Sequence, residues 1–248
     1  MQKGLSLANT NIKAPCAPEG FYNQKRQRDN TMELLEFARG PALQVASLIF
    51  VAGVIWRLFH IFLIQKKVDI SEPRQGGLRA GGVRAYFSRF LQHKEFRPRT
   101  RVGTALAYTI HIGLAIIVFG SAPHVLFIES LTGLSWPPLP TVAIHVAGAV
   151  TLAALLTSLG RRLVHPVLKL LSNFDDYFTW LVTTLPVVTG LMTVAHLGAR
   201  YEMLLALHIM SFNVFLVWFP FGKLMHSMLA FGSRYTTGYT FTRKGARV

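Results

Sequence analysis

The segment LHIMSFNVFLVWFPFGKLMH, residues 207–226, has a histidine near each end and is otherwise mostly apolar. An ionisable side chain inside hydrocarbon is costly and usually has a function. His208 and His226 are 18 residues apart, and 18 steps of about 100° return to the same face of a straight helix, about 27 Å further along its axis. The segment therefore predicts a membrane-spanning helix that carries two histidines for a common purpose.

The remainder of the chain has the same apolar character. Of its 248 residues 51% are hydrophobic and only 15% are charged, whereas soluble domains carry about 25% charged residues. Five segments reach the length of about 20 residues that a membrane helix needs, and they lie near 41–64, 103–122, 141–160, 178–197 and 203–228. Strands of about 5–6 residues are too short to explain them. We expect an all-α integral membrane bundle of five helices over residues 32–248.

The first 31 residues differ from the rest, because they contain no continuous apolar run. A signal peptide would need one, so we expect a disordered extension, with Met32 as an alternative start of the protein.

Basic residues in the connections predict the orientation. Ten of the 26 Lys and Arg residues fall in 65–101, three in 161–176 and five after residue 222, whereas 123–140 has none and 198–203 has only Arg200. We therefore expect the C-terminus in the cytoplasm, the N-terminus outside, and a multi-pass protein of the cell inner membrane in contact with lipid. The net charge of +15 does not indicate nucleic-acid binding, because the basic residues alternate with apolar runs.

Several motifs can be set aside. A single cysteine, Cys16, excludes an intramolecular disulfide framework and a site made of cysteines alone. GGLRAGG, residues 76–82, lacks the lysine of a phosphate-binding loop and is interpreted as a flexible linker. Asp175 and Asp176 precede the fourth span and are expected to cap a helix rather than bind a metal.

Nine histidines occur in the chain. His93 and His165 lie in basic connections and His60 at the inner end of the first span, where solvent or interface accounts for them. Six lie within or at the ends of the other spans: His111, His124, His145, His196, His208 and His226. Any one of them, taken alone, is explained more simply by a hydrogen bond between helices.

The direction of the spans brings four of these histidines into two pairs. The second span runs outward and the fifth inward, so His111 and His226 lie near the cytoplasmic side, and His124 and His208 near the outer side. Tetrahedral zinc wants further ligands. Haem iron wants two axial ligands and an apolar pocket, so two haem sites at different depths are predicted.

The spacing of the two histidines at the second span does not match the spacing of their partners in the fifth span. His111 and His124 are 13 residues apart, about 20 Å on a straight helix, against about 27 Å between their partners. Gly120 and Pro123 offer a remedy, because proline removes a backbone hydrogen bond and redirects the chain. Pro220 likewise interrupts the fifth span. A break within a turn of Pro123 is expected to turn His124 toward His208. If His124 is not the outer ligand, His145 and His196 are the substitutes, and a protein with one haem on His111 and His226 stays an alternative.

The histidine segment LHIMSFNVFLVWFPFGKLMH resembles the last helix of the nitrate reductase gamma-subunit family of membrane cytochromes b. YTIHIGLAIIVFG and MELLEFARGPAL resemble the second helix and the amino-terminal end of that family. The nitrate reductase form has a histidine directly after VFG, where this chain has Ser121. GSAPHVLFIESLTGLSWPPLP instead resembles the cytochrome b subunits of sulfite-reductase-linked and Hmc-type complexes, in which the outer ligand falls at the position of His124.

The resemblance covers about residues 32–248 and implies a membrane-anchor subunit with two haem b groups. It implies electron exchange between a quinone and a cytoplasmic partner, either an iron–sulfur subunit or a molybdenum enzyme. An outer-face cytochrome c is a further candidate partner. The rival class is a non-redox transporter or assembly subunit whose histidines relay protons or bridge helices, for which inverted repeats would be expected.

Overall fold

The structure is a computed structural model that describes residues 19–64, 69–90 and 94–246. Cys16, His93 and three basic residues of the predicted inside segments (Lys66, Lys67 and Arg247) lie outside this range. All regular secondary structure in the described residues is helical: α1 (Glu19–Phe37), the π-helical segment η1 (Ala38–Ala42), α2 (Leu43–Leu63), α3 (Leu78–Ser88), α4 (Arg97–Gly120), α5 (Ala122–Thr132), α6 (Thr141–Val164), α7 (Pro166–Leu171), α8 (Phe174–Ala195), α9 (Tyr201–Trp218), the 3-10 turn η2 (Lys223–Met225) and α10 (His226–Arg243).

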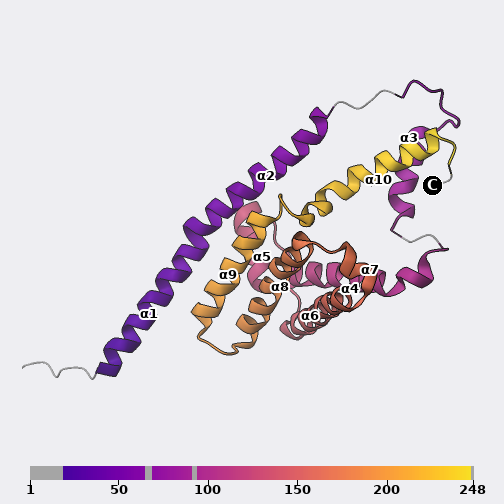
Figure 1. Ribbon diagram of the computed structural model, residues 1–248. Helices are drawn as coiled ribbons and strands as arrows, with labels where there is room; N and C mark the ends of the chain where they lie inside the picture. Colours follow the sequence, from indigo (N-terminus) through magenta and orange to yellow (C-terminus); the bar gives the residue numbers. More distant parts are fainter. Residues whose placement is uncertain (1–18, 65–68, 91–93, 247–248) are drawn as a thin grey trace, which may run out of the picture.

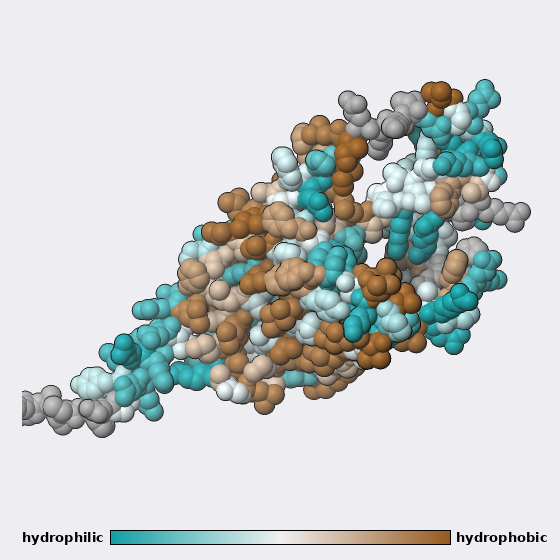
Figure 2. Space-filling model, viewed as in Figure 1, coloured by the Kyte–Doolittle hydropathy of each residue, from teal (hydrophilic) through white to brown (hydrophobic). Residues whose placement is uncertain are grey.

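Five helical segments of the described chain are long and apolar enough to cross a membrane, which confirms the expected number. They are Tyr22–Ile61, Arg97–Gly120, Thr141–Val164, Phe174–Ala195 and Tyr201–Trp218. Leu48 and Trp56 on α2 are 69% and 68% exposed, which would be unfavourable in water because large apolar surfaces are normally buried. Brown apolar surface predominates over the middle of the molecule, and the two ends along the direction of α1 and α2 are largely teal (Figure 2). The protein is a multi-pass membrane protein whose helices face lipid.

The spanning helices pack in the order α2, α9, α8, α6, α4, and α1 with α2 forms one long rod at the edge of the bundle (Figure 1). In the described residues α4, which is last in this order, makes no extensive contact with α9, which is second. Direct helix packing therefore leaves this side of the bundle open.

The fifth span is shorter than expected. The span expected near 203–228 is interrupted at Pro220, as predicted, but more fully than a kink: α9 ends at Trp218 and a break separates it from α10. Pro220 has no backbone N–H and cannot continue the helix, and Gly222 and Phe221 instead donate to the carbonyl of Trp218. His208 and His226 therefore belong to two helices, and the argument from one straight helical face fails.

Two connections also contain more helix than expected. GGLRAGG is not a flexible linker throughout, because α3 begins at Leu78 and packs along α10, away from the bundle (Figure 1). A Cβ at Gly238 would lie 2.7 Å from the carbonyl oxygen of Gly81, so the absence of a side chain permits this close approach. In the expected disordered extension, residues 19–31 form the first turns of α1, continuous with the first span; residues 1–18 lie outside the description.

The end of α10 is tied to the connection before α3. Arg243 Nε lies 3.2 Å from Asp69 Oδ2, and Arg243 also donates to the carbonyl oxygens of Asp69 and Ser71. The hydroxyl and amide of Ser71 donate to Asp69 and, with the nearby Arg243, lower the pKa of that carboxyl. The described part of the basic connection over 65–101 thus contains an ordered helix, α3, which pairs with α10.

Candidate functional site

Two histidine pairs face each other across the open side of the bundle. The ring centroids of His111 on α4 and His226 at the start of α10 are 6.0 Å apart, with an angle of 82° between the ring planes. Those of His124 on α5 and His208 on α9 are also 6.0 Å apart, with an angle of 20°. The pairing expected from the span directions is therefore confirmed.

The break after α4 accounts for the position of His124. The helix ends at Gly120, Ser121 is extended, and Pro123 occupies the first turn of α5. A helix end leaves carbonyl groups that need other donors. The ring Nδ1 of His124 lies 3.0 Å from the carbonyl oxygen of Ile117. The predicted break near Pro123 is confirmed, and it directs His124 toward His208.

The loop that follows α5 closes the same helix end. Trp136 Nε1 donates to the carbonyl oxygen of Phe119 at 2.6 Å, and the backbone N–H of Leu139 donates to the carbonyl oxygen of Gly120 at 2.8 Å. Three of the last four carbonyl groups of α4, those of Ile117, Phe119 and Gly120, thus accept from the histidine, the tryptophan and the loop backbone. This arrangement fixes the angle between α4 and α5.

His208 is held by α8. Its Nδ1 lies 3.2 Å from Thr189 Oγ1, and a Cβ at Gly190 would lie 3.0 Å from the Cε1 atom of His208. The ring therefore packs directly against the backbone of α8. Sequence reasoning missed both residues, although a glycine preceded by a threonine in an apolar helix is the pattern for such a close contact.

The inner pair is oriented by backbone carbonyls. His111 Nδ1 lies 2.7 Å from the carbonyl oxygen of Ala107, and His226 Nδ1 lies 2.7 Å from that of Lys223. Metal-ligating histidines usually bond through one ring nitrogen while the other donates to a carbonyl or carboxylate. In all four histidines Nδ1 has a partner within the protein, so Nε2 is the nitrogen available for a ligand bond.

The turn that carries His226 is anchored to the beginning of α8. Asn173 and Asp176 form a reciprocal capping box, so the expected capping role is confirmed for Asp176. The same carboxylate pairs with Arg162 at 2.9 Å and with Lys223 of η2. Asp175 accepts the amide of Lys223 at 3.3 Å. The contacts of Lys223, which link residues 47 and 48 positions apart, were not foreseen from the sequence.

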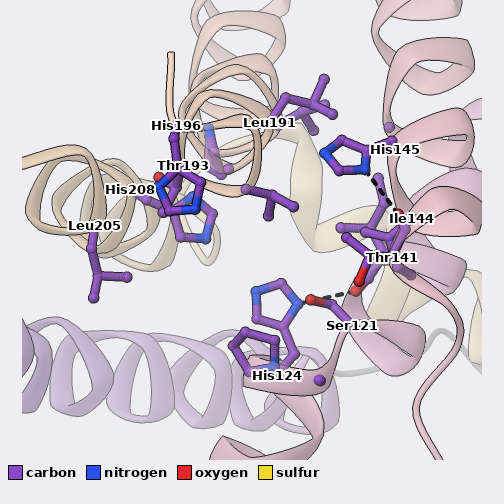
Figure 3. Close-up of a pocket in the computed structure, with 18 of the residues that line it drawn as sticks. Ser121, His124, Thr141, Ile144, His145, Leu191, Thr193, His196, Leu205 and His208 are labelled. Carbon is purple, nitrogen blue, oxygen red and sulfur yellow. Dashed lines mark hydrogen bonds between the residues drawn. The ribbon is translucent and has the colours of Figure 1, made fainter. Parts of the chain in front are cut away.

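A cavity of about 290 Å³ adjoins the outer pair. Its walls are mostly apolar, but His145 and His196 line it together with His124 and His208 (Figure 3). His145 Nδ1 lies 3.0 Å from the carbonyl oxygen of Thr141, and the ring of His196 lies 5.5 Å from that of Tyr201. The two substitutes are therefore close to the outer site without displacing the His124–His208 pair. His60 and His165 are exposed.

The donor set suits a metal held by two axial imidazoles. Two imidazoles bound on opposite sides of one metal, with metal–nitrogen bonds of about 2.0–2.1 Å, place their ring centroids about 6.3 Å apart. Both pairs meet this distance to within a few tenths of an ångström. No group of three or more His, Cys, Asp or Glu residues in the described chain could hold a metal ion, as a tetrahedral zinc site would require. Either pair could therefore hold one metal between its two imidazole nitrogens.

Comparisons with known proteins leave the family open. No protein-family model matches the chain, and no solved structure matches it. A protein of Nitratidesulfovibrio vulgaris strain Hildenborough is 28% identical over 217 residues, which cover 85% of this chain and 95% of the relative. Its name states no activity.

Proposed function

We propose that the protein is a membrane-anchor cytochrome b subunit with two haem b groups, which exchanges electrons between the quinone pool and a partner redox subunit. One observation carries the proposal: two histidine pairs, at two positions along the bundle, have the ring separation that two axial ligands of one iron require. In all four histidines a protein group bonds Nδ1, which leaves Nε2 for a ligand bond.

Haem b, when bound, supplies one-electron redox chemistry at its iron, with a potential that depends on axial ligands, hydrogen bonds and burial. The chain's own contribution is to hold and orient the ligands. Ala107 and Lys223 accept the Nδ1 protons of the inner pair, and Ile117 and Thr189 bond the outer pair. Such second partners fix the ring orientation and raise the basicity of the ligand nitrogen.

The two sites differ in their surroundings, which supports different roles. His111 and His226 are exposed in the isolated chain, whereas His124 and His208 are partly buried beside the cavity. The inner pair lies at the junction of the bundle with α10, next to the basic α3–α10 pair. An acidic iron–sulfur or molybdenum-enzyme subunit on the cytoplasmic side would complement that charge.

The orientation follows the distribution of basic residues, with the C-terminus in the cytoplasm of a cell whose inner membrane holds the protein. The α3–α10 pair and the last turn of α6, with Arg161 and Arg162, would then face the cytoplasm, and α5 the outside. A path from the outer to the inner pair would therefore cross most of the membrane.

Quinol-driven reduction tests this function. The protein would be purified in lipid nanodiscs, and the b-type absorption would be followed after anaerobic addition of 2-methylnaphthalene-1,4-diol. We expect reduction of the bound haem by the diol, and loss of one of two spectral components in His124→Ala. A purified chain without b-type absorption would refute the proposal and favour a non-redox membrane protein.

A further inference from the structure

The α3–α10 pair carries a group of aromatic side chains where α3 ends. Tyr86 of α3 stacks on Phe231 of α10 with ring centroids 5.8 Å apart. It also lies edge-on to Phe87 and Phe90, whose centroids are 5.0 and 5.7 Å away. Phe87 and Phe231 are 65% and 58% exposed. We call these four residues the aromatic cluster, and in water its exposed rings would be unfavourable.

A hydrogen bond from α4 shows how deep the aromatic cluster lies. The hydroxyl of Tyr108 donates to the carbonyl oxygen of Phe90, and α4 is one of the helices long and apolar enough to cross the membrane. Tyr108 follows Arg101 by seven residues, a rise of about 10 Å along α4. A tyrosine side chain is shorter than this rise, so Phe90 lies nearer to the apolar part of α4 than Arg101 does. The aromatic cluster is therefore at the edge of the span.

The edge of a membrane span is where exposed aromatic side chains are favourable. Amphipathic rings are enriched at the boundary between hydrocarbon and water, and phenylalanine is one of the residues that surface-lying helices insert there. Contact with lipid at this boundary therefore accounts for the exposure of Phe87 and Phe231.

Two arginines flank the aromatic cluster. The guanidinium carbon of Arg234 lies 4.5 Å from the ring centroid of Phe90. A guanidinium group stacked on a ring in this way keeps the N–H groups at its edge for an anion. Arg101 is exposed, and its spacing of seven residues places it on the same face of α4 as Tyr108. Neither arginine forms an ion pair with an acidic side chain of the described chain.

The charge of this surface restricts what can cover it. The helices α3 and α10 together contain four arginines and no Asp or Glu, so a second copy of the same surface would bring like charges together. A phosphate group accepts paired N–H bonds from a guanidinium group. An anionic phospholipid adds acyl chains to that phosphate, and it is present at the edge of the span.

We propose that Arg101, Arg234 and the aromatic cluster form a binding site for an anionic phospholipid of the leaflet at this end of the bundle. The headgroup phosphate pairs with the two guanidinium groups, and the acyl chains contact the exposed rings of Phe87 and Phe231. The net negative charge of the lipid distinguishes it from a zwitterionic phospholipid, because basic residues near a membrane surface attract anionic lipids.

Native mass spectrometry of the full chain in detergent tests the proposal, with dioleoylphosphatidylglycerol and dioleoylphosphatidylcholine as probes. The two lipids have the same acyl chains and differ in the charge of the headgroup. We expect phosphatidylglycerol to bind about twenty-five-fold more tightly, because each of the two arginines contributes about a fivefold preference for an anionic lipid. Equal binding of the two lipids would overturn the proposal.

Four variants assign the preference to this site. Arg101→Gln and Arg234→Gln should each lower it about fivefold, and Arg234→Lys, which keeps the charge, should retain it. Arg89→Gln is the matched control, because Arg89 also stacks on a ring, 5.4 Å from the centroid of Phe241. Phe241 lies ten residues beyond Phe231, about 15 Å further along α10, where salt screens the charge, so this variant should keep the preference. An equal loss in Arg89→Gln and Arg234→Gln, or a loss in Arg234→Lys, would overturn the proposal.

The contact with the acyl chains has a separate test. Phe87→Gln removes an exposed ring and leaves the charges in place, so it should weaken both lipids by a similar factor. Unchanged binding of both lipids in this variant would refute the contact of the aromatic cluster with acyl chains.

An acidic protein on this surface would give a different outcome. The chain would then bind soluble poly-L-glutamate, Arg234→Gln would weaken that binding, and the two lipids would bind equally, which refutes the lipid site. The proposal uses neither the histidines nor haem. A chain without haem that prefers phosphatidylglycerol would therefore retain this site and refute the cytochrome, and a chain with two haems and no lipid preference would do the reverse.

Discussion

The outer histidine pair can be perturbed without touching either histidine. Gly190→Ala adds one methyl group on α8, and its carbon would lie 3.0 Å from Cε1 and 3.3 Å from Nδ1 of His208. Ordinary van der Waals contacts are wider, so the ring must move by several tenths of an ångström. Metal–ligand distances tolerate about 0.2 Å, and Thr189, the neighbouring residue on α8, bonds the Nδ1 of the same ring. The substitution should therefore weaken the outer site selectively.

The expected magnitude follows from two opposing effects. Overpacking a well-packed position costs about 1–3 kcal/mol, and replacing glycine by alanine within a helix returns about 0.5–1 kcal/mol. A net cost of about 1–2 kcal/mol corresponds to about a five- to thirtyfold lower affinity for the outer haem. The assay is the haem retained per chain after incubation with excess apomyoglobin as a scavenger.

A matched control makes the same chemical change at a different helical glycine. A Cβ at Gly160 on α6 would have nothing within 4 Å, so Gly160→Ala should retain both haems. Equal retention of haem in Gly190→Ala and Gly160→Ala would refute the packing of His208 against α8 as the determinant of the outer site.

Three further predictions concern the inner site, its anchor and the orientation. His226→Ala should remove about half of the haem, because one axial ligand of the inner pair is lost while the outer pair is untouched; two low-spin haems in the purified variant would refute the assignment. Asp176→Ala removes the partner of Arg162 and Lys223 and should lower the free energy of unfolding by about 1–3 kcal/mol, with the inner haem lost first. The expected readouts are a lower Tm and a changed absorption spectrum, and the control Asp175→Asn, which keeps an acceptor, should change both less. An unchanged spectrum and Tm in Asp176→Ala would contradict the anchoring role. A reporter enzyme that is active only in the cytoplasm should be active when fused after Val248, because the C-terminus is expected there. If only a reporter that requires the outer side of the membrane were active, the proposed orientation would be wrong.

The number of spans and the pairing of histidines followed from local properties of the sequence. Length and hydropathy predict a membrane helix because its backbone must satisfy its own hydrogen bonds within the lipid. Antiparallel succession of the spans then places His111 near His226 and His124 near His208. The break at Pro123 was also predictable, since proline acts on its own turn.

The remaining features depend on contacts between distant segments. Pro220 indicated a break after Trp218, but the geometry of that break depends on the bonds of Lys223 to the start of α8. The pairing of α3 with α10 depends on the fit of Gly238 to Gly81. In the sequence Asn213 is one polar residue in an apolar helix. Its role is visible only in the structure, where it donates a hydrogen bond to the carbonyl oxygen of Ala38 in the π-helical segment η1.

The central claim, two haems each held by two histidines, is tested most directly by counting them. Purified protein would be analysed for haem b per chain by the pyridine haemochrome method and for iron coordination by electron paramagnetic resonance of the oxidised form. We predict two haems per chain, both six-coordinate and low-spin, with two distinct signals because the ring planes meet at 82° in the inner pair and 20° in the outer pair. One haem per chain, no haem, or a high-spin iron in the unmodified protein would contradict the assignment of the two pairs.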